Sequence, residues 1–212
     1  MTRCIYIATV GRSGSSALAG ALHQAGISFG EPDDLMGAHR TLNPRGHFEM
    51  HTWFRAERGI AEAVEAGREP DAADLERIAE LSAQRSEQHP VIWGVKSARP
   101  LALRYVWPLL PKDTLLLLAK REFTATVASY MVHGKLDEET ARQKVTDYYT
   151  ALRAGVASIG IEPIAVCYEH LIQHPDITLG WVLRVCYGGK QMVTTAQIEA
   201  AVDWIEPALK HY

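Results

Sequence analysis

The feature that most constrains the fold is a short apolar run, TLLLLAK, at residues 114–120. It is the most apolar segment of the chain that has the length of a strand. Fully apolar short runs are typical of parallel sheets that are covered by helices on both faces. The run therefore predicts a buried strand in such a sheet.

Three further apolar runs alternate with helical patterns. Strands are predicted at residues 5–10, 91–96 and 164–168, and helices at residues 17–25, 53–66, 72–88, 101–110, 123–131 and 138–159, followed by C-terminal helices around Gly188 and Gly189. Strands that alternate with helices indicate an open α/β sheet with right-handed crossovers. Because no linker or internal repeat interrupts the pattern, we expect residues 1–212 to form one domain, a three-layer α/β/α fold with a parallel sheet.

The composition excludes a general affinity for polyanions. Of the 212 residues, 47% are hydrophobic and 22% are charged, with a formal net charge of −3. This balance predicts no nucleic acid partner and no attraction to an anionic membrane, so any bound anion needs locally placed groups. The N-terminal apolar run is too short to span a membrane. We expect a cytoplasmic protein without stable membrane insertion, in which Cys4, Cys167 and Cys186 are buried free thiols.

Polar clusters follow each predicted strand. They are GRSGSS at residues 11–16, KSAR at 96–99, KRE at 120–122 and YEH at 168–170. In an open parallel sheet, ligands bind at the carboxyl ends of the strands. The four clusters therefore predict one shared site.

The cluster GRSGSS has the composition of a phosphate-binding loop. Gly11 and Gly14 permit a tight turn whose N–H groups converge, and Ser15 and Ser16 add hydroxyl donors at the start of the next helix. The alternative is a simple strand-to-helix turn with a capping serine. A magnesium-dependent nucleotide loop would need a lysine after Gly14 and an aspartate after the apolar strand, and the sequence has neither. We therefore expect a phosphate-like ligand and no metal.

The segment GRSGSSAL resembles the loop that binds the 5′-phosphosulfate in sulfotransferases that use 3′-phosphoadenosine 5′-phosphosulfate (PAPS). In this resemblance Arg12 takes the position of the basic residue near the transferred group, and residues 11–16, including Ser13, contact the donor. The segment REFTATVASYM resembles the family's 3′-phosphate element, with Arg121 and Ser129 on one phosphate. On its own that element would also suit a surface arginine and a helical serine.

Weaker matches to the family follow in the expected order. They are NPRGHFE at residues 43–49, VKSAR at 95–99, YEHLIQHP at 168–175 and WIEPALKHY at 204–212. Together they extend the resemblance over almost the whole chain. The resemblance implies the P-loop NTPase-like sulfotransferase fold, PAPS as the donor, and Tyr168 as a further donor-binding residue.

Sulfuryl transfer requires donors for the developing charge and a base for the acceptor's proton. Arg12 is expected to supply donors for the developing charge, and Lys96 is a second candidate for this role. The histidine that serves as base in family members acting on phenols and steroids is replaced here by Ala98. Glu49 is the first candidate for the base because it matches a glutamate of the bacterial pattern, although it also suits a helix-capping role.

His47 and His51 flank Glu49 and are the alternative bases, because histidine has a suitable intrinsic pKa. The acceptor is expected to meet the loop at residues 31–51 and the helices around residues 53–88, and the sequence suits a small molecule, a carbohydrate or a lipid headgroup equally. The competing functions are a P-loop small-molecule kinase and a non-catalytic nucleotide-binding protein. A homo-oligomer is left open. The charged segments 57–65 and 137–144 are predicted to be solvated helix faces.

Overall fold

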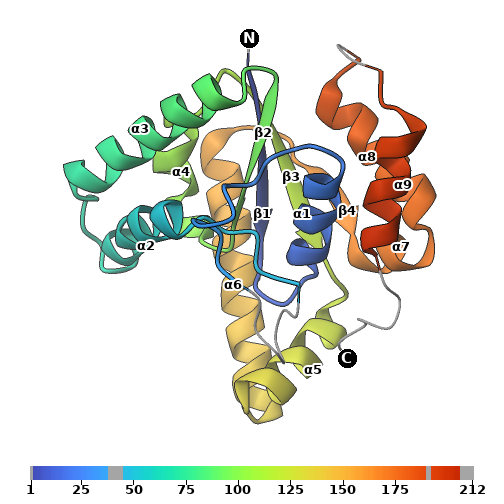
Figure 1. Cartoon of the computed structure of the whole chain (residues 1–212). Helices are drawn as coiled ribbons and strands as arrows, with labels where there is room; N and C mark the ends of the chain where they lie inside the picture. The colour runs from blue at the N-terminus through green and yellow to red at the C-terminus, as the bar shows by residue number, and fades with distance from the viewer. Residues whose placement is uncertain (1, 38–44, 190–191, 206–212) are drawn as a thin grey trace.

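A four-stranded parallel sheet forms the centre of the protein, which is described here by a computed structural model covering residues 2–37, 45–189 and 192–205 (Figure 1). The strands are β1 (Arg3–Thr9), β2 (Ile92–Ser97), β3 (Asp113–Lys120) and β4 (Ile164–Cys167). Their order in the sheet is β2-β1-β3-β4, and all neighbours are parallel. The predicted α/β fold with a parallel sheet is confirmed.

The strand order creates a crevice at the carboxyl edge of the sheet. The chain moves from β1 to β2 in one direction and then crosses back to β3 on the other side of β1. Ile7 of β1 aligns with Lys96 and with Leu117, so the three strands end at nearly the same level. The point where strand order reverses is where open α/β sheets bind ligands. The glycine loop (residues 11–16) begins there, at the end of β1.

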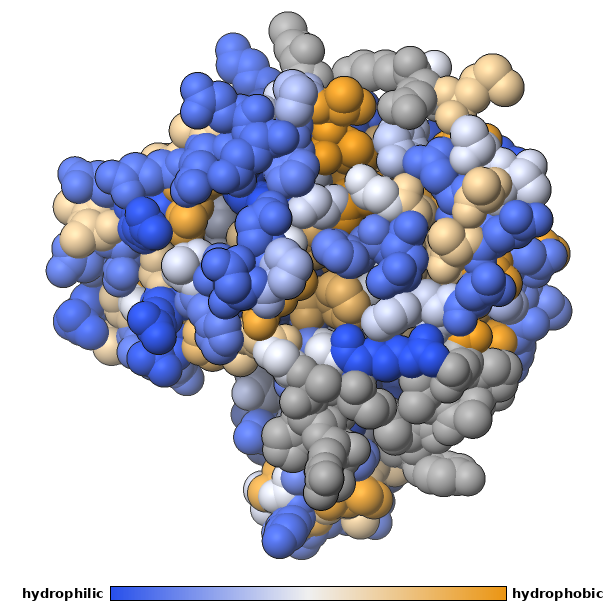
Figure 2. Space-filling view, viewed as in Figure 1, coloured by the Kyte–Doolittle hydropathy of each residue, from blue (hydrophilic) through white to orange (hydrophobic). Residues whose placement is uncertain are grey.

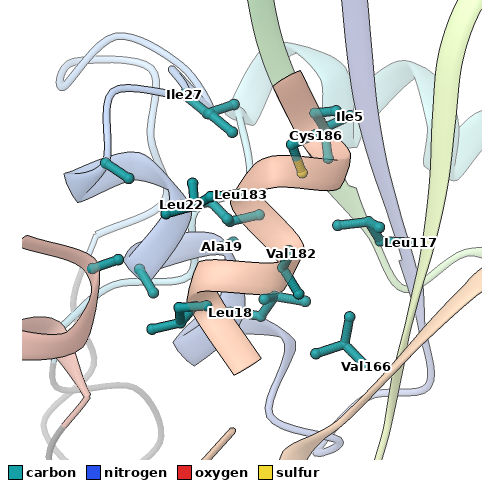
Figure 3. Close-up of a cluster of buried hydrophobic side chains, with 14 of the residues drawn as sticks. Ile5, Leu18, Ala19, Leu22, Ile27, Leu117, Val166, Val182, Leu183 and Cys186 are labelled. Atoms are coloured by element: carbon teal, nitrogen blue, oxygen red, sulfur yellow. The ribbon is translucent and has the colours of Figure 1, made fainter. Parts of the chain in front are cut away.

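Helices at both chain ends cover one face of the sheet. They are α1 (Ser15–Gln24), α7 (Tyr168–Gln173), α8 (Pro175–Tyr187) and α9 (Thr195–Trp204). Leu18 and Leu22 of α1 lie with Val182 of α8 over Ile5 and Leu117 of the sheet (Figure 3). This buried contact fixes the start of α1, and with it the glycine loop.

The opposite face is covered by the middle of the chain. Its helices are α2 (His51–Glu65), α3 (Ala72–Gln88), α4 (Leu103–Val106) and α6 (Glu138–Ile159). Two 3₁₀ turns, Pro100–Ala102 and Trp107–Leu109, flank α4. Helix α5 (Phe123–Gly134) lies beyond the carboxyl edge of the sheet (Figure 1). The prediction of one helix at residues 101–110 was wrong, because this segment forms three short pieces. Pro108 has no N–H for an α-helical bond and its ring crowds the preceding turn.

Two predictions about side-chain exposure need correction. Cys4 and Cys186 are buried as expected, but Cys167 is partly exposed, because β4 is an edge strand. On the face shown in Figure 2 the surface over α2 and α3 is mostly hydrophilic, yet Glu57 of α2 is completely buried. Among the described residues, no helix combines the length and apolarity needed to cross a membrane.

Candidate functional site

The glycine loop has the geometry of an anion-binding turn. Gly14 lies in the left-handed region at φ 82° and forms the N-cap of α1, where it provides no capping side chain. The first N–H groups of a helix without such a cap remain available to an anion, and the helix dipole favours negative charge there. Arg12 also has a positive φ, 70°, which turns the loop sharply after Gly11. The loop thus directs backbone donors toward the carboxyl edge of the sheet.

Aromatic rings pack directly on both glycines. A Cβ at Gly14 would lie 2.0 Å from Cδ2 of Tyr168, and one at Gly11 would lie 2.5 Å from the hydroxyl oxygen of Tyr130. Gly14 therefore requires glycine, whereas a Cβ at Gly11 would require the hydroxyl of Tyr130 to move. Tyr168, predicted as a donor-binding residue, lies against the loop at Gly14.

The serines of the loop have different orientations. The hydroxyl of Ser13 is buried, donates to the carbonyl of Val10 at 2.7 Å and contacts the hydroxyl of Thr9, so it holds the turn from inside. Ser15 is also buried. Ser16 donates to the carbonyl of His47 at 3.4 Å. The hydroxyl of Ser13 is therefore engaged within the turn.

The two predicted phosphate elements meet at this loop. Nε of Arg12 donates to the hydroxyl of Ser129 at 3.0 Å, and a guanidinium N–H of Arg121 donates to the carbonyl of Arg12 at 3.3 Å. The guanidinium of Arg121 lies 5.0 Å from the ring centre of Tyr168. Burial lowers the pKa of Arg12, and the nearby charge of Arg121 adds to this effect. The two guanidinium charges therefore repel each other, and an anion bound near both would reduce that repulsion.

A second cluster lies at the end of β2, and we call Glu49, Lys96 and Arg99 the Glu49 cluster. The ammonium of Lys96 is 2.5 Å from one carboxylate oxygen of Glu49, and a guanidinium nitrogen of Arg99 is 3.5 Å from the other. Arg99 also stacks on Phe54, with 3.6 Å between its guanidinium carbon and the ring centre. Phe48 has a positive φ of 54°, and this turn directs Glu49 inward. The predicted base and Lys96 therefore form a direct ion pair.

The environment of Glu49 keeps it ionised. Burial alone would raise its pKa, but the charges and hydrogen bond of Lys96 and Arg99 outweigh burial and lower the pKa below its ordinary value. His47 lies close enough to add a small lowering effect. The side chain of His51 is exposed at the start of α2. The structure thus places Glu49 deepest among the three candidate bases.

Glu57 is a buried polar group that the predictions from the sequence did not include. Glu57 is 0% exposed and accepts a hydrogen bond from the hydroxyl of Tyr6 at 2.5 Å. Burial raises its pKa from the ordinary 4.5 to about 7, although the hydroxyl of Tyr6 acts in the opposite direction. The signal was present in the sequence: Trp53, Glu57 and Ile60 recur at the spacing of one helix face, and the two apolar members are buried.

The loop and the Glu49 cluster belong to one edge of the sheet. Ser16 of the glycine loop contacts the backbone of His47, two residues before Glu49. Within the described ranges, no group of three or more His, Cys, Asp or Glu residues could hold a metal ion. Asn43 and Pro44 of the NPRGHFE match, and residues 206–212 of the C-terminal match, lie outside the described residues. The predicted site residues that are described therefore gather around the reversal point of the sheet.

Solved structures of sulfotransferase domains share this fold. All of this chain aligns with 83% of the sulfotransferase domain from the Synechococcus PCC 7002 olefin synthase, with a TM-score of 0.58 and 16% identity. It also aligns over 95% of its length with 71% of the sulfotransferase STF1 from Mycobacterium tuberculosis H37Rv, with a TM-score of 0.58 and 16% identity. Over 94% of its length, this chain also aligns with 78% of the sulfotransferase domain from the curacin biosynthetic pathway, with a TM-score of 0.55 and 15% identity.

No family model and no curated protein matches the sequence. The structural comparisons confirm the predicted fold, which is that of the sulfotransferase domains.

Proposed function

We propose that this chain is a sulfotransferase that moves a sulfuryl group from PAPS to a hydroxyl or amine of a small acceptor. The observation that carries the proposal is the meeting of Arg12, Arg121 and Ser129 at the glycine loop. These residues come from segments more than one hundred positions apart in the chain. Their convergence occurs in a fold shared with sulfotransferase domains, which supports an activity of that class.

The donor side fits a nucleotide that carries two separate phosphate groups. The glycine loop and the start of α1 suit the 5′-phosphosulfate, and Arg121 with Ser129 suits the 3′-phosphate. When bound, the donor supplies the sulfuryl group, which forms a bond to the acceptor atom as the bond to the phosphate oxygen breaks. Arg12 belongs to the glycine loop and contacts Ser129 of the second phosphate element, and it would stabilise the charge that develops on that oxygen.

The Glu49 cluster supplies the groups for the acceptor. The carboxylate of Glu49 would take the proton that the acceptor hydroxyl or amine loses, and Lys96 holds that carboxylate ionised before the reaction. Arg99 fixes the second oxygen of Glu49 and is itself held by Phe54. This role for Glu49 does not require the histidine that Ala98 replaces.

The acceptor is proposed to be a small molecule, a carbohydrate or a lipid headgroup. A cytoplasmic location and a possible homo-oligomer stay predictions from the sequence. The competing functions, a P-loop kinase or a non-catalytic nucleotide-binding protein, would require different ligands. A kinase needs magnesium and adenosine triphosphate, and no lysine follows Gly14 to reach the outer phosphates.

Calorimetric titration tests the proposal directly. We expect 3′,5′-adenosine bisphosphate to bind without magnesium and more tightly than adenosine triphosphate does. Binding of adenosine triphosphate alone, and only with magnesium, would instead support the kinase. If the protein binds the bisphosphate but transfers no sulfuryl group from PAPS to any member of a broad acceptor panel, the result would support a non-catalytic nucleotide-binding protein.

Arg121→Ala tests the assignment of the 3′-phosphate. A charge-assisted contact is worth roughly 1.5–3 kcal/mol, so the variant should bind the bisphosphate about 10-fold to 100-fold more weakly. Binding of 5′-AMP, which lacks the 3′-phosphate, should change far less. Arg142→Ala, an exposed arginine of α6, is the matched control and should change neither affinity. Equal losses for both nucleotides with Arg121→Ala would remove the role given to this residue.

A further inference from the structure

A separate pocket of about 650 Å³ lies between α6 and the β3 side of the sheet. Its apolar lining includes Leu118 of β3, Phe123 of α5, and Leu152 and Val156 of α6. Leu118 belongs to the sheet face that α6 covers, whereas Tyr168 packs against the opposite core, beside α1. The pocket is therefore on the other side of the sheet from the packing of Tyr168 on the glycine loop.

The pocket exists because the sheet extends beyond its helical cover. Strand β4 is a short edge strand, and Ala165 on it is exposed. One face of α6 borders this uncovered part of the sheet, with Tyr149, Arg153 and Val156 at helical spacing. The volume falls within the roughly 300–1,000 Å³ that is usual for small-molecule sites. Its shape and lining thus suit a small ligand with an apolar body.

The charge of the pocket is entirely positive. Of the residues that the structure describes, Lys120, Arg121 and Arg153 line it and no carboxylate does. Lys120 and Arg153 are exposed, and neither forms an ion pair with any of the residues that the structure describes. This contrasts with the net charge of −3 for the whole chain. Cations at the rim of an apolar pocket favour a ligand with one anionic end.

The pocket is also connected to the glycine loop. Tyr149 lines it and donates from its hydroxyl to the carbonyl of Arg121 at 2.9 Å. Arg121 in turn donates to the carbonyl of Arg12. A ligand that contacts Tyr149 and Arg121 would therefore touch the residues that hold the loop.

We propose that this pocket binds an amphiphilic organic anion, with its apolar chain or ring against Leu118, Leu152 and Val156 and its acidic group between Lys120 and Arg153. Arg121 lines both this pocket and the proposed donor site, but the proposal does not depend on sulfuryl transfer, because the apolar lining and the other two cations are not part of the donor site. The ligand class follows from the combination of an apolar floor with the exposed cations Lys120 and Arg153, in a lining whose described residues include no carboxylate.

The test uses three probes of equal chain length on the full chain: octanoate, 1-octanol and octylammonium. Amide NMR shifts would report both affinity and place of binding. We expect octanoate to shift residues of α6 and β3, and to bind at least about tenfold more tightly than either other probe, since an ionic hydrogen bond is worth roughly 1.5–3 kcal/mol.

Matched variants on α6 distinguish the pocket from general surface binding. Ala157→Trp fills the pocket and should weaken octanoate binding at least tenfold, whereas Ala154→Trp adds the same ring at an exposed position outside the lining and should not. Arg153→Gln should remove much of the preference over octanol. Equal octanoate affinity in Ala157→Trp and the unmodified protein, or equal affinity for octanoate and octylammonium, would overturn the proposal. Loss of sulfuryl transfer would not, because binding is measured without donor.

Discussion

The glycine loop and the Glu49 cluster lie at the same edge of the sheet but surround their cations differently. At the loop, Arg12 contacts a hydroxyl, and Arg121 contacts a carbonyl oxygen and an aromatic ring. In the Glu49 cluster, Lys96 and Arg99 both face the carboxylate of Glu49. Among these contacts, the cations of the loop meet neutral groups, whereas those of the Glu49 cluster meet a carboxylate.

This difference suits two ligands of different charge. A polyanionic donor gains most where cations converge with backbone donors and hydroxyls. A neutral acceptor gains more from a site whose charges are already balanced and whose carboxylate can take a proton. The comparison therefore separates a donor side from an acceptor side within one site, and the following variants test that separation.

Glu49→Gln should have the largest effect. Loss of a general base lowers kcat by roughly 10²–10⁴-fold, while the affinity for 3′,5′-adenosine bisphosphate should change less than about threefold. Steady-state kinetics and calorimetry on the same preparation measure the two quantities. Unchanged turnover would exclude Glu49 as the base. A large loss of bisphosphate affinity would show that the two regions are not separate.

Glu57→Gln should change stability in a pH-dependent way. Because the pKa of Glu57 is raised to about 7 in the folded protein, the folded state binds the extra proton between about pH 4.5 and 7, and stability falls as pH rises through that range. Glutamine has no proton to lose. The variant should equal the unmodified protein below about pH 4 and be more stable by about 3 kcal/mol at pH 8.

Urea unfolding at several pH values measures this difference. Glu65→Gln, an exposed position on the same helix, is the control and should follow the unmodified protein at every pH. If the stability difference between Glu57→Gln and the unmodified protein stays constant from pH 5 to 8, Glu57 is ionised throughout, and its buried environment does not raise its pKa.

Ser129→Ala should have a moderate effect that is confined to the donor side. The variant removes the hydroxyl that accepts from Arg12 at 3.0 Å, and a hydrogen bond to a charged group is worth roughly 1.5–3 kcal/mol at most. We expect about a tenfold loss of bisphosphate affinity, measured by calorimetry. The pKa of Glu49, followed by carboxyl NMR, should not move. A shift of that pKa would indicate coupling between the regions.

His51→Asn should have the smallest effect. His51 is exposed at the start of α2, so kcat/KM should stay within about twofold of the unmodified value. His47→Asn is the informative partner, because His47 lies near Glu49. A loss of about 10²-fold or more in either variant would transfer the role of base from Glu49 to that histidine.

The sequence alone determined the parallel α/β fold, the glycine loop and the nature of the groups at the carboxyl edge. The apolar run of β3 and the helical patterns beside it depend on spacing within one segment, which the sequence shows directly. Gly14 is required by a local backbone angle. The match of Arg121 and Ser129 to a known pattern also depends on local spacing.

The tertiary structure alone decided how those groups interact. The contact of Arg12 with Ser129 joins residues 117 positions apart, and the burial of Glu57 depends on how α2 packs against β1. The opposite pKa shifts of Glu49 and Glu57 follow from that packing, because one carboxylate has two cations beside it and the other has mainly a hydroxyl and an apolar surrounding. Desolvation and charge pairing require distances in three dimensions, which no spacing along the chain contains.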